Sequence, residues 1–176
     1  KKGGITVSGG EPLMQASAII PFFSRLKAEG FNTCIDTNGS YLNDAVKELL
    51  RYTDLVLLDI KEIDDAAHKK MTGITNKATL RMAEYLHEIN KPVWVRYVLV
   101  PGYTDKEEHL HELGRFLQPM TNIQKLEIQP YHKLGIHKYK SLGWKYELEG
   151  VEQNTPEQLK KAKEIFGQYV REVVVN

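Results

Sequence analysis

Short apolar runs typical of β-strands alternate with helical stripes along the chain, and this alternation limits the fold more than any other feature. The runs rich in Val, Ile, Leu or aromatic residues cover 5–8, 33–36, 55–59, 93–100 and 125–129. Between them, apolar residues recur every three or four positions, as on one face of a helix. Repeated strand–helix units indicate an α/β fold in which helices surround a parallel sheet that is either doubly wound or part of a barrel.

The helical stripes also predict where individual helices lie. Phe22 and Phe23 belong to the first helix, and Pro21 indicates that this helix begins just before it or is kinked. The last helix begins at Pro156, with Thr155 as its N-cap. A run over 173–175 is a candidate terminal strand. The middle stripes are Leu42, Ala45, Val46, Leu49 and Leu50; Leu80, Ala83, Leu86 and Ile89; and Leu110, Leu113, Phe116 and Leu117.

Length and composition are those of a globular chain, and we expect one domain over 1–176. The net charge of +1 gives no electrostatic argument for binding nucleic acid or an anionic membrane. No apolar run approaches the ~18 residues of a membrane span. The single cysteine, Cys34, excludes a disulfide framework. We therefore expect a cytoplasmic protein in which Cys34 is a small core residue.

Polar residues gather where the predicted strands end. They are Ser8-Gly9-Gly10-Glu11, Asp36-Thr37-Asn38-Gly39, Asp59-Ile60-Lys61 and Pro130-Tyr131-His132, together with Arg96 inside the fourth run. In α/β barrels the active site is built at the carboxyl ends of the strands. The placement therefore favours an enzyme or a small-ligand site.

Each cluster also has a purely structural explanation. Gly9 and Gly10 fit an ordinary turn, but they would also let a ligand touch the backbone while Glu11 binds its amine. Asp36 and Asn38 fit turn or cap residues equally well. These alternatives stay open at the level of sequence.

The charged residues carry more specific expectations. Asp59 and Lys61 share a strand face, so a local ion pair is one interpretation. If the strands bearing Asp36 and Asp59 pair, the two carboxylates lie close together at the same end of the sheet. They then repel each other unless a cation or a ligand ammonium lies between them. Arg96 needs a partner, either a structural carboxylate or a substrate backbone. His132 ends a strand in line with the other clusters. The remaining histidines are expected to face solvent: His68, His87, His109, His111 and His137.

The sequence over 5–13 resembles the Gly-Gly-Glu segment of radical S-adenosylmethionine enzymes. Residues 33–39, 54–61, 93–102 and 130–132 resemble the family of pyruvate formate-lyase activating enzymes in particular, and 135–139 and 148–151 extend the likeness. It covers essentially the whole chain in order. The resemblance implies a partial (βα)6 TIM-like barrel of parallel strands, truncated at the N-terminus to about five strands, with outer helices.

The resemblance also implies the chemistry. A reduced 4Fe-4S cluster, supplied with electrons by a flavodoxin or ferredoxin, would cleave S-adenosylmethionine. The 5′-deoxyadenosyl radical would take a hydrogen atom from a backbone glycine of pyruvate formate-lyase or another glycyl radical enzyme. By position, the resemblance assigns Gly9, Gly10 and Glu11 to the methionine amino end, and Asp59, Lys61 and His132 to the rest of S-adenosylmethionine. It assigns Asp36, Thr37 and Asp59, with the carbonyl of Leu57, to a monovalent cation, and Arg96 to the partner's glycyl loop.

The family's cluster motif, C-x3-C-x2-C, is absent, since Cys34 is the only cysteine. We therefore expect residue 1 to be a cut site, with at least ~30 residues missing, and this piece to be inactive alone. An uncovered edge at 5–8 would favour a dimer through that edge or through the helix containing Phe22 and Phe23.

Two other functions are weighed against this one. A Schiff-base aldolase would use Lys61, but its amine must lose a proton, and Asp59 on the same face stabilises the ammonium form. A module that only binds S-adenosylmethionine or a partner loop is the second alternative. It would bind S-adenosylmethionine weakly, because the cluster that chelates the ligand is missing.

Overall fold

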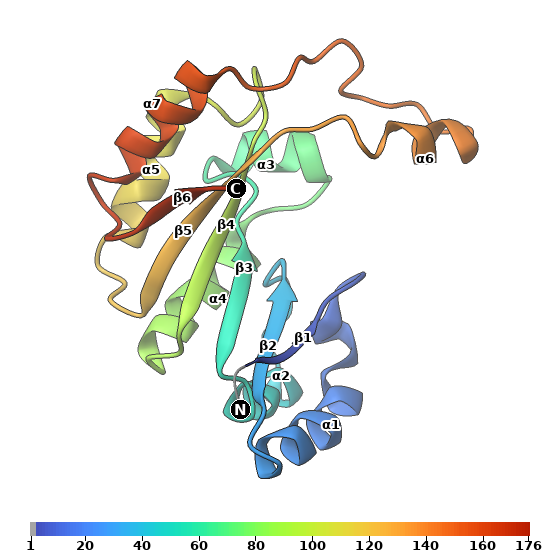
Figure 1. Cartoon of the computed structure of the whole chain (residues 1–176), viewed down its shortest axis with the longest axis vertical. Coiled ribbons are helices and arrows are strands. Elements are labelled where there is room, and N and C mark those ends of the chain that lie inside the picture. The colour runs from blue at the N-terminus through green and yellow to red at the C-terminus, as the bar shows by residue number, and fades with distance from the viewer. Residues whose placement is uncertain (1–2) are drawn as a thin grey trace.

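Six parallel strands form one sheet in the computed structural model, which describes residues 3–176 apart from the side chain of Lys140. The strands are β1 (Gly4–Val7), β2 (Asn32–Thr37), β3 (Leu55–Asp59), β4 (Val93–Leu99), β5 (Ile123–Pro130) and β6 (Val173–Val175). They lie side by side in chain order from β1 to β6 (Figure 1). The predicted parallel sheet and strand order are confirmed, and the terminal run at 173–175 extends the expected five strands to six.

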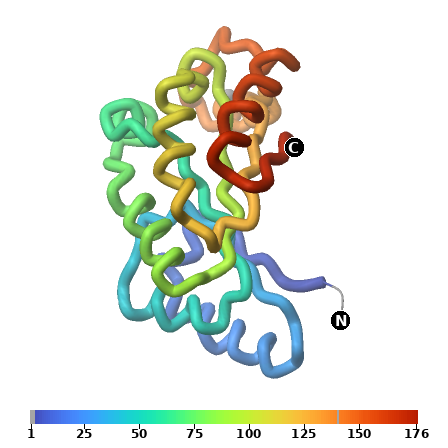
Figure 2. The backbone as a smooth tube through the Cα atoms, turned by 90° about the vertical axis from the view of Figure 1, so that its left-hand side faces the viewer, coloured from blue at the N-terminus to red at the C-terminus, as the bar shows by residue number. Residues whose placement is uncertain are grey.

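Helices connect the strands, and most of them pack against one face of this sheet. They are η1 (Pro12–Gln15), α1 (Ala16–Ala28), α2 (Asp44–Arg51), α3 (Asp65–Thr72), α4 (Lys77–Glu88), α5 (Glu107–Leu117), α6 (Ile136–Ser141) and α7 (Pro156–Phe166). The helices α4, α5 and α7 cover the left-hand side of the sheet in Figure 1 and lie in front of it in Figure 2, whereas α6 stands away from the sheet. Thr155 is the N-cap of α7 as predicted, and Gln158 completes a capping box with it.

Burial alternates along the strands, and this alternation gives the sheet two different faces. In β2, Ile35 is buried while Asp36 is half-buried, and in β3 the same holds for Leu58 and Asp59. Successive strand residues point to opposite faces. The buried set packs under the helices and forms the core. We call the other side, which carries Cys34, Asp36, Asp59 and Arg96, the open face.

Cys34 lies on the open face, so the expectation that it is a core residue is wrong. It is half-buried and stands one residue out of phase with the core positions Thr33 and Ile35. Burial first, with the nearby Asp36 carboxylate adding to it, raises the pKa of the Cys34 thiol. The sequence pattern predicts that Cys34 lies in a strand, but it does not indicate which face of the sheet the helices cover.

Of the two alternatives for the first helix, a start just before Pro21 is wrong, while the kink stays a prediction. The helix begins at Ala16, directly after η1, and Pro21 lies inside it rather than at its start. Pro21 is exposed, as is Ser17 one turn earlier, so the Ser17 carbonyl that loses its N–H donor can face water. Phe23 is fully buried, while Phe22 on the same helix is 48% exposed. Of the two, Phe22 is therefore the side chain available to a second chain.

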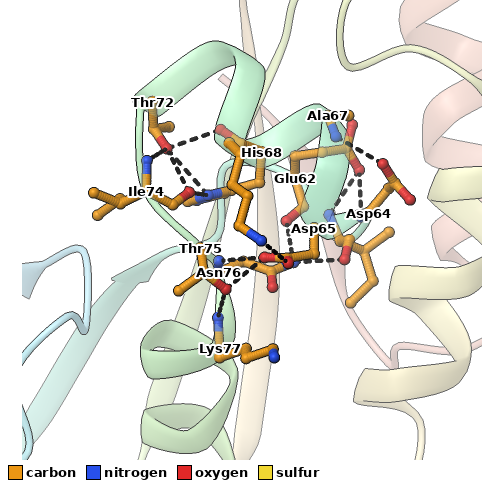
Figure 3. Close-up of polar contacts among 12 residues, drawn as sticks. Glu62, Asp64, Asp65, Ala67, His68, Thr72, Ile74, Thr75, Asn76 and Lys77 are labelled. Carbon is orange, nitrogen blue, oxygen red and sulfur yellow. Dashed lines mark hydrogen bonds and ion pairs between the residues drawn. The ribbon is translucent and has the colours of Figure 1, made fainter.

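The histidines were expected to face solvent, and for most of them this is wrong. His68 is 5% exposed and its Nδ1 lies 2.8 Å from the Ile74 carbonyl oxygen (Figure 3). The His109 side chain is 12% exposed beside Glu62. His87 and His111 are half-buried, with ring contacts to Asn122 and Tyr169 respectively. Only His137 is exposed as expected.

Candidate functional site

The polar clusters that follow the strands lie along one edge of the sheet. Asp36 is the Cα partner of Leu57 in the parallel ladder, and Asp59 is the partner of Arg96. All four side chains belong to half-buried positions of the open face. Since the strands are parallel, their carboxyl ends meet at this edge, where the sequence predicted the site.

Arg96 has its partner within the chain. Its Nη1 donates to Asp36 Oδ2 at 2.8 Å, and its Nε lies 3.9 Å from Glu127 Oε2. With the Gln129 amide oxygen turned toward it, Arg96 also donates to Gln129 from Nη2 at 2.6 Å and Nε at 2.7 Å. Ser8 donates its hydroxyl to the same Asp36 oxygen at 2.9 Å. Arg96 therefore supplies the positive charge that the Asp36 carboxylate needs.

Asp59 and Lys61 form the local ion pair that their spacing suggested. Lys61 Nζ lies 2.9 Å from Asp59 Oδ2, and the two side chains are 37% and 24% exposed. The amine of Lys61 is thus in contact with a carboxylate and is not isolated in an apolar pocket, which disfavours a Schiff-base lysine. Both groups keep exposed surface at the edge of the sheet and can still meet a ligand.

Glu11 ties the loop after β1 to the end of β2. Its Oε1 accepts from the Thr37 hydroxyl at 2.6 Å and from the Leu13 N–H at 2.9 Å. Its Oε2 accepts from the Asn38 N–H at 3.0 Å. The side chain is thus the N-cap of η1 and a brace between two strands. Oε2 still has a lone pair for a ligand donor.

Gly9 and Gly10 leave the backbone of this loop open. Their φ angles are +92° and +56°, a region that favours glycine. A Cβ built on either residue would meet nothing within 4 Å, and both residues are exposed. A ligand can therefore reach this stretch of backbone without meeting a side chain.

The residues assigned to a cation are engaged with protein groups. Thr37 is 4% exposed on the core side of β2, where its hydroxyl donates to Glu11 and accepts from the Gly39 N–H at 3.0 Å. Asp36 is held by Arg96 and Ser8. Within residues 3–176 as described, no three His, Cys, Asp or Glu side chains are grouped to hold a metal ion. The cation site stays a prediction.

His132 is exposed two residues after the last residue of β5, at the same edge. The backbone before it is fixed, because the Tyr131 N–H donates to the Leu99 carbonyl at 3.2 Å and to Asn154 Oδ1 at 2.8 Å. This brings His132 to the end of β5, but no described contact joins its ring to the other site residues.

Sequence reasoning assigned no role to Glu127 and Gln129, which surround Arg96. Lys125, Glu127 and Gln129 are polar at every second position of β5. This alternation could have shown that Glu127 and Gln129 share one face of the strand, since a period of two marks one face. Lys125 completes the group: its Nζ lies 2.7 Å from Glu127 Oε1 and 3.5 Å from the centre of the Trp94 ring.

Comparison with known proteins gives the same family from several directions. The model of the radical SAM superfamily matches residues 1–114. The pyruvate formate-lyase-activating enzyme of Staphylococcus epidermidis is 48% identical over 166 residues, which are 91% of this chain and 66% of that protein. The pyruvate formate-lyase 1-activating enzyme of Escherichia coli K12 is 42% identical over 174 residues, 98% of this chain and 71% of that protein.

Solved structures share the fold. A domain of the pyruvate-formate lyase-activating enzyme from Bacteroides vulgatus superposes with a TM-score of 0.83 at 22% identity, over 99% of both chains. Streptococcus suis SuiB bound to S-adenosylmethionine superposes with a TM-score of 0.74 at 18% identity, over 98% of this chain and 39% of that one. The present chain spans about two thirds of the length of its sequence relatives. By these matches it belongs to the radical SAM superfamily and, within it, to the family of pyruvate formate-lyase activating enzymes.

Proposed function

We propose that this chain is the core of an activating enzyme that uses S-adenosylmethionine to place a radical on a backbone glycine of a glycyl radical enzyme, pyruvate formate-lyase being the expected partner. The observation that carries the proposal is the gathering of the Gly9-Gly10-Glu11 loop, Asp59 with Lys61, and Arg96 at one sheet edge. The names of the sequence relatives support the same reaction.

The superfamily uses S-adenosylmethionine and a 4Fe-4S cluster, and the residues at the edge fit the first of these. Gly9 and Gly10 offer open backbone, and Glu11 Oε2 has a lone pair for the ligand ammonium. Asp59 and Lys61 offer one charge of each sign, and His132 stands exposed beyond them. When bound, S-adenosylmethionine supplies the 5′-deoxyadenosyl group that takes the hydrogen atom.

Arg96 has donors left for a partner's backbone. A guanidinium carries five N–H groups. Asp36 takes one from Nη1, and Gln129 takes one from Nη2 and the one from Nε. One N–H on each terminal nitrogen remains, on a side chain that is 24% exposed. We propose that these two donate to carbonyl groups of the partner's glycyl loop while Asp36 and Gln129 hold the guanidinium still.

The cluster does not fit the residues present. Cys34 is the only cysteine, it lies in a strand, and its thiol pKa is raised by burial. Three thiolates are therefore not available in this chain. We propose that the 176 residues alone are inactive. Anaerobic reconstitution with iron and sulfide, read by absorbance and EPR, should give no 4Fe-4S signal; one cluster per chain would contradict the proposal.

Activity is tested in the holoenzyme, by which we mean this chain joined to a segment that supplies the three cysteines of the family motif. With S-adenosylmethionine and reduced flavodoxin or ferredoxin, it should produce a glycyl radical EPR signal on pyruvate formate-lyase. A second glycyl radical enzyme in parallel assays decides between related activating enzymes. Binding of S-adenosylmethionine without any radical on either partner would leave the binding-only alternative.

Location and assembly are also proposals. None of the described helices is long and apolar enough to cross a membrane. We place the activity in the cytoplasm, where its partners and electron donors are expected. The dimer stays a prediction: β1 is an edge strand of the described sheet, with Ile5 38% exposed, and Phe22 is exposed on α1. A light-scattering mass of one chain at high concentration would argue against it.

A further inference from the structure

The segment that carries Lys61 lies beyond the hydrogen-bonded part of the sheet. Just past the end of β3, the Ile60 N–H still donates to the Arg96 carbonyl at 3.1 Å. The helix α3 then begins at Asp65, with Asp64 as its N-cap. Residues 61–63 belong to neither element, so other groups must hold their backbone in place.

Glu62 and Asn76 supply those groups. Glu62 Oε1 accepts from the Ile63 N–H at 2.6 Å and from the Asp64 N–H at 3.1 Å. Asn76 Nδ2 donates to the Glu62 carbonyl at 3.1 Å and to the Ile63 carbonyl at 2.6 Å (Figure 3). Asn76 is itself 2% exposed. Both N–H groups and C=O groups of the turn between β3 and α3 are thus hydrogen-bonded to these two side chains.

Glu62 is a fully buried carboxylate, 0% exposed, and His109 from α5 stands beside it. His109 Nδ1 lies 3.3 Å from Glu62 Oε1. Glu62 Oε2 has no hydrogen-bond partner among residues 3–176 as described. Burial and then the Glu62 charge raise the pKa of Tyr97, whose hydroxyl donates to the Thr104 carbonyl at 2.7 Å.

A buried carboxylate is unfavourable unless a partner compensates it. His109 Nδ1 lies at ion-pair distance from Glu62 Oε1 but makes no hydrogen bond within residues 3–176 as described, and a protonated imidazole there would compensate the carboxylate. The contact links the turn after β3 to α5. Burial keeps alternating past the end of β3: Asp59 and Lys61 are half-buried, whereas Ile60 and Glu62 are buried. Lys61 therefore points to the open face because Glu62 is anchored on the helix side.

We infer that Glu62 and His109 are positioning residues, which hold the turn after β3 so that Lys61 and Asp59 meet S-adenosylmethionine in the right place. This rests on the proposed function. Neither residue is expected to touch the ligand. Their effect passes through the backbone of 61–63, which the Glu62 carboxylate fixes directly.

The test compares KM for S-adenosylmethionine with kcat in the holoenzyme. Glu62→Ala should raise KM about tenfold while kcat changes less than about twofold, because ligand placement is lost and the reaction itself is not. Glu62→Gln keeps an oxygen for the Ile63 and Asp64 N–H groups and should bring KM back to within about threefold. His109→Ala, which removes the imidazole beside the Glu62 carboxylate, should raise KM by at least about threefold.

Asp54→Ala is the matched control. Asp54 also accepts a backbone N–H, from Thr33 at 2.9 Å, and also pairs with a cation, Lys27, but at the opposite end of the sheet. It should lower the urea midpoint without changing KM. If Glu62→Ala and His109→Ala also lower only the midpoint, the two residues are merely structural and the inference is overturned. If Glu62→Ala does not fold, His109→Ala decides alone.

Failure of the proposed function has a different result. A wild-type holoenzyme that binds S-adenosylmethionine in calorimetry but makes no glycyl radical would contradict the function. The same calorimetry on Glu62→Ala would still decide the inference, with a Kd weakened about tenfold expected and an unchanged Kd overturning it.

Discussion

Arg96 on β4 and Asp36 on β2 form an ion pair across the intervening strand β3, with Nη1 and Oδ2 2.8 Å apart. The two side chains are 24% and 20% exposed. Glu127 and Gln129 approach the same guanidinium from β5. Arg96 thus lies between two carboxylates, Asp36 on one side of β4 and Glu127 on the other. The resemblance to the activating-enzyme family assigns Asp36 to a cation. A bound cation would therefore compete with Arg96 for Asp36.

Arg96→Ala should destabilise the fold by about 1–3 kcal/mol, because it leaves Asp36 and Glu127 without their shared partner at partly buried positions. Urea unfolding at neutral pH measures the change. Arg25→Ala is the control. The Arg25 side chain, which pairs with Glu29, is 82% exposed, so this substitution should lower the free energy of unfolding by less than about 0.5 kcal/mol. Equal effects of the two variants would show that the Arg96 network adds no stability.

Gly10→Ala and Gly39→Ala should separate backbone strain from crowding. Both residues have positive φ, +56° and +69°. A Cβ at Gly10 meets nothing within 4 Å, so the cost is that of the backbone alone, about 1 kcal/mol. A Cβ at Gly39 lies 2.7 Å from Leu58 Cδ1 in the core, which adds overpacking of about 1–3 kcal/mol.

In ligand binding the order should reverse: Gly10→Ala should weaken binding of S-adenosylmethionine more than Gly39→Ala does. The methyl of Gly10→Ala occupies the open side of the loop after β1, so the Kd for S-adenosylmethionine in the holoenzyme should rise. Gly39 faces Leu58 and Met82, away from that loop, so its substitution should affect stability first. A Gly10→Ala protein with unchanged Kd would show that the ligand does not use this backbone.

Stability should fall in acid partly through Asp65. Hydrogen bonds from Lys69 and then Thr75 hold the pKa of Asp65 well below its usual range. The unfolded chain therefore takes up a proton on Asp65 at higher pH than the folded chain does. The stabilisation is complete at neutral pH and is lost as pH falls below about 4.

Urea midpoints at pH 7 and pH 3 test this expectation. The difference between wild type and Asp65→Asn should be clear at pH 7 and should shrink at pH 3. Asp44→Asn serves as the control, since the Asp44 side chain is fully exposed at the start of α2 and its Lys47 contact is long, 3.7 Å. A difference for Asp65→Asn that is equal at both pH values would contradict the assignment.

Cys34 should react slowly with iodoacetamide in the folded chain. Burial, then the Asp36 carboxylate, raises the pKa of its thiol, and the thiolate is the reactive form. At pH 8 we expect alkylation at least about tenfold slower than in the same chain unfolded by urea. Asp36→Asn should speed the folded reaction because it removes a nearby negative charge. Equal rates in folded and unfolded protein would contradict both statements.

The sequence alone predicted the strands well and the short helices poorly. Each predicted strand overlaps the observed one, and 55–59 and 173–175 match β3 and β6 to the residue. The long apolar stripes gave α2, α4, α5 and α7. By contrast, α3 has the sequence DAAHKKMT, which carries no stripe of large apolar residues, and α6 has only 6 residues, too few for a stripe to repeat. Their positions depend on contacts such as Asn76 with the Glu62 carbonyl, which are distant in sequence.

What the sequence determined is the class of fold and the edge of the sheet at which the polar residues of the candidate site gather. Period and turn chemistry are local properties, and polar residues followed each predicted strand. Tertiary structure alone decided which face of the sheet each strand residue takes and which charges meet. It turned Cys34 to the open face, buried His68 and His109, and joined Arg96 to Asp36 across 60 residues of chain. Such pairings depend on how strands from distant parts of the chain align, and no local pattern encodes that alignment.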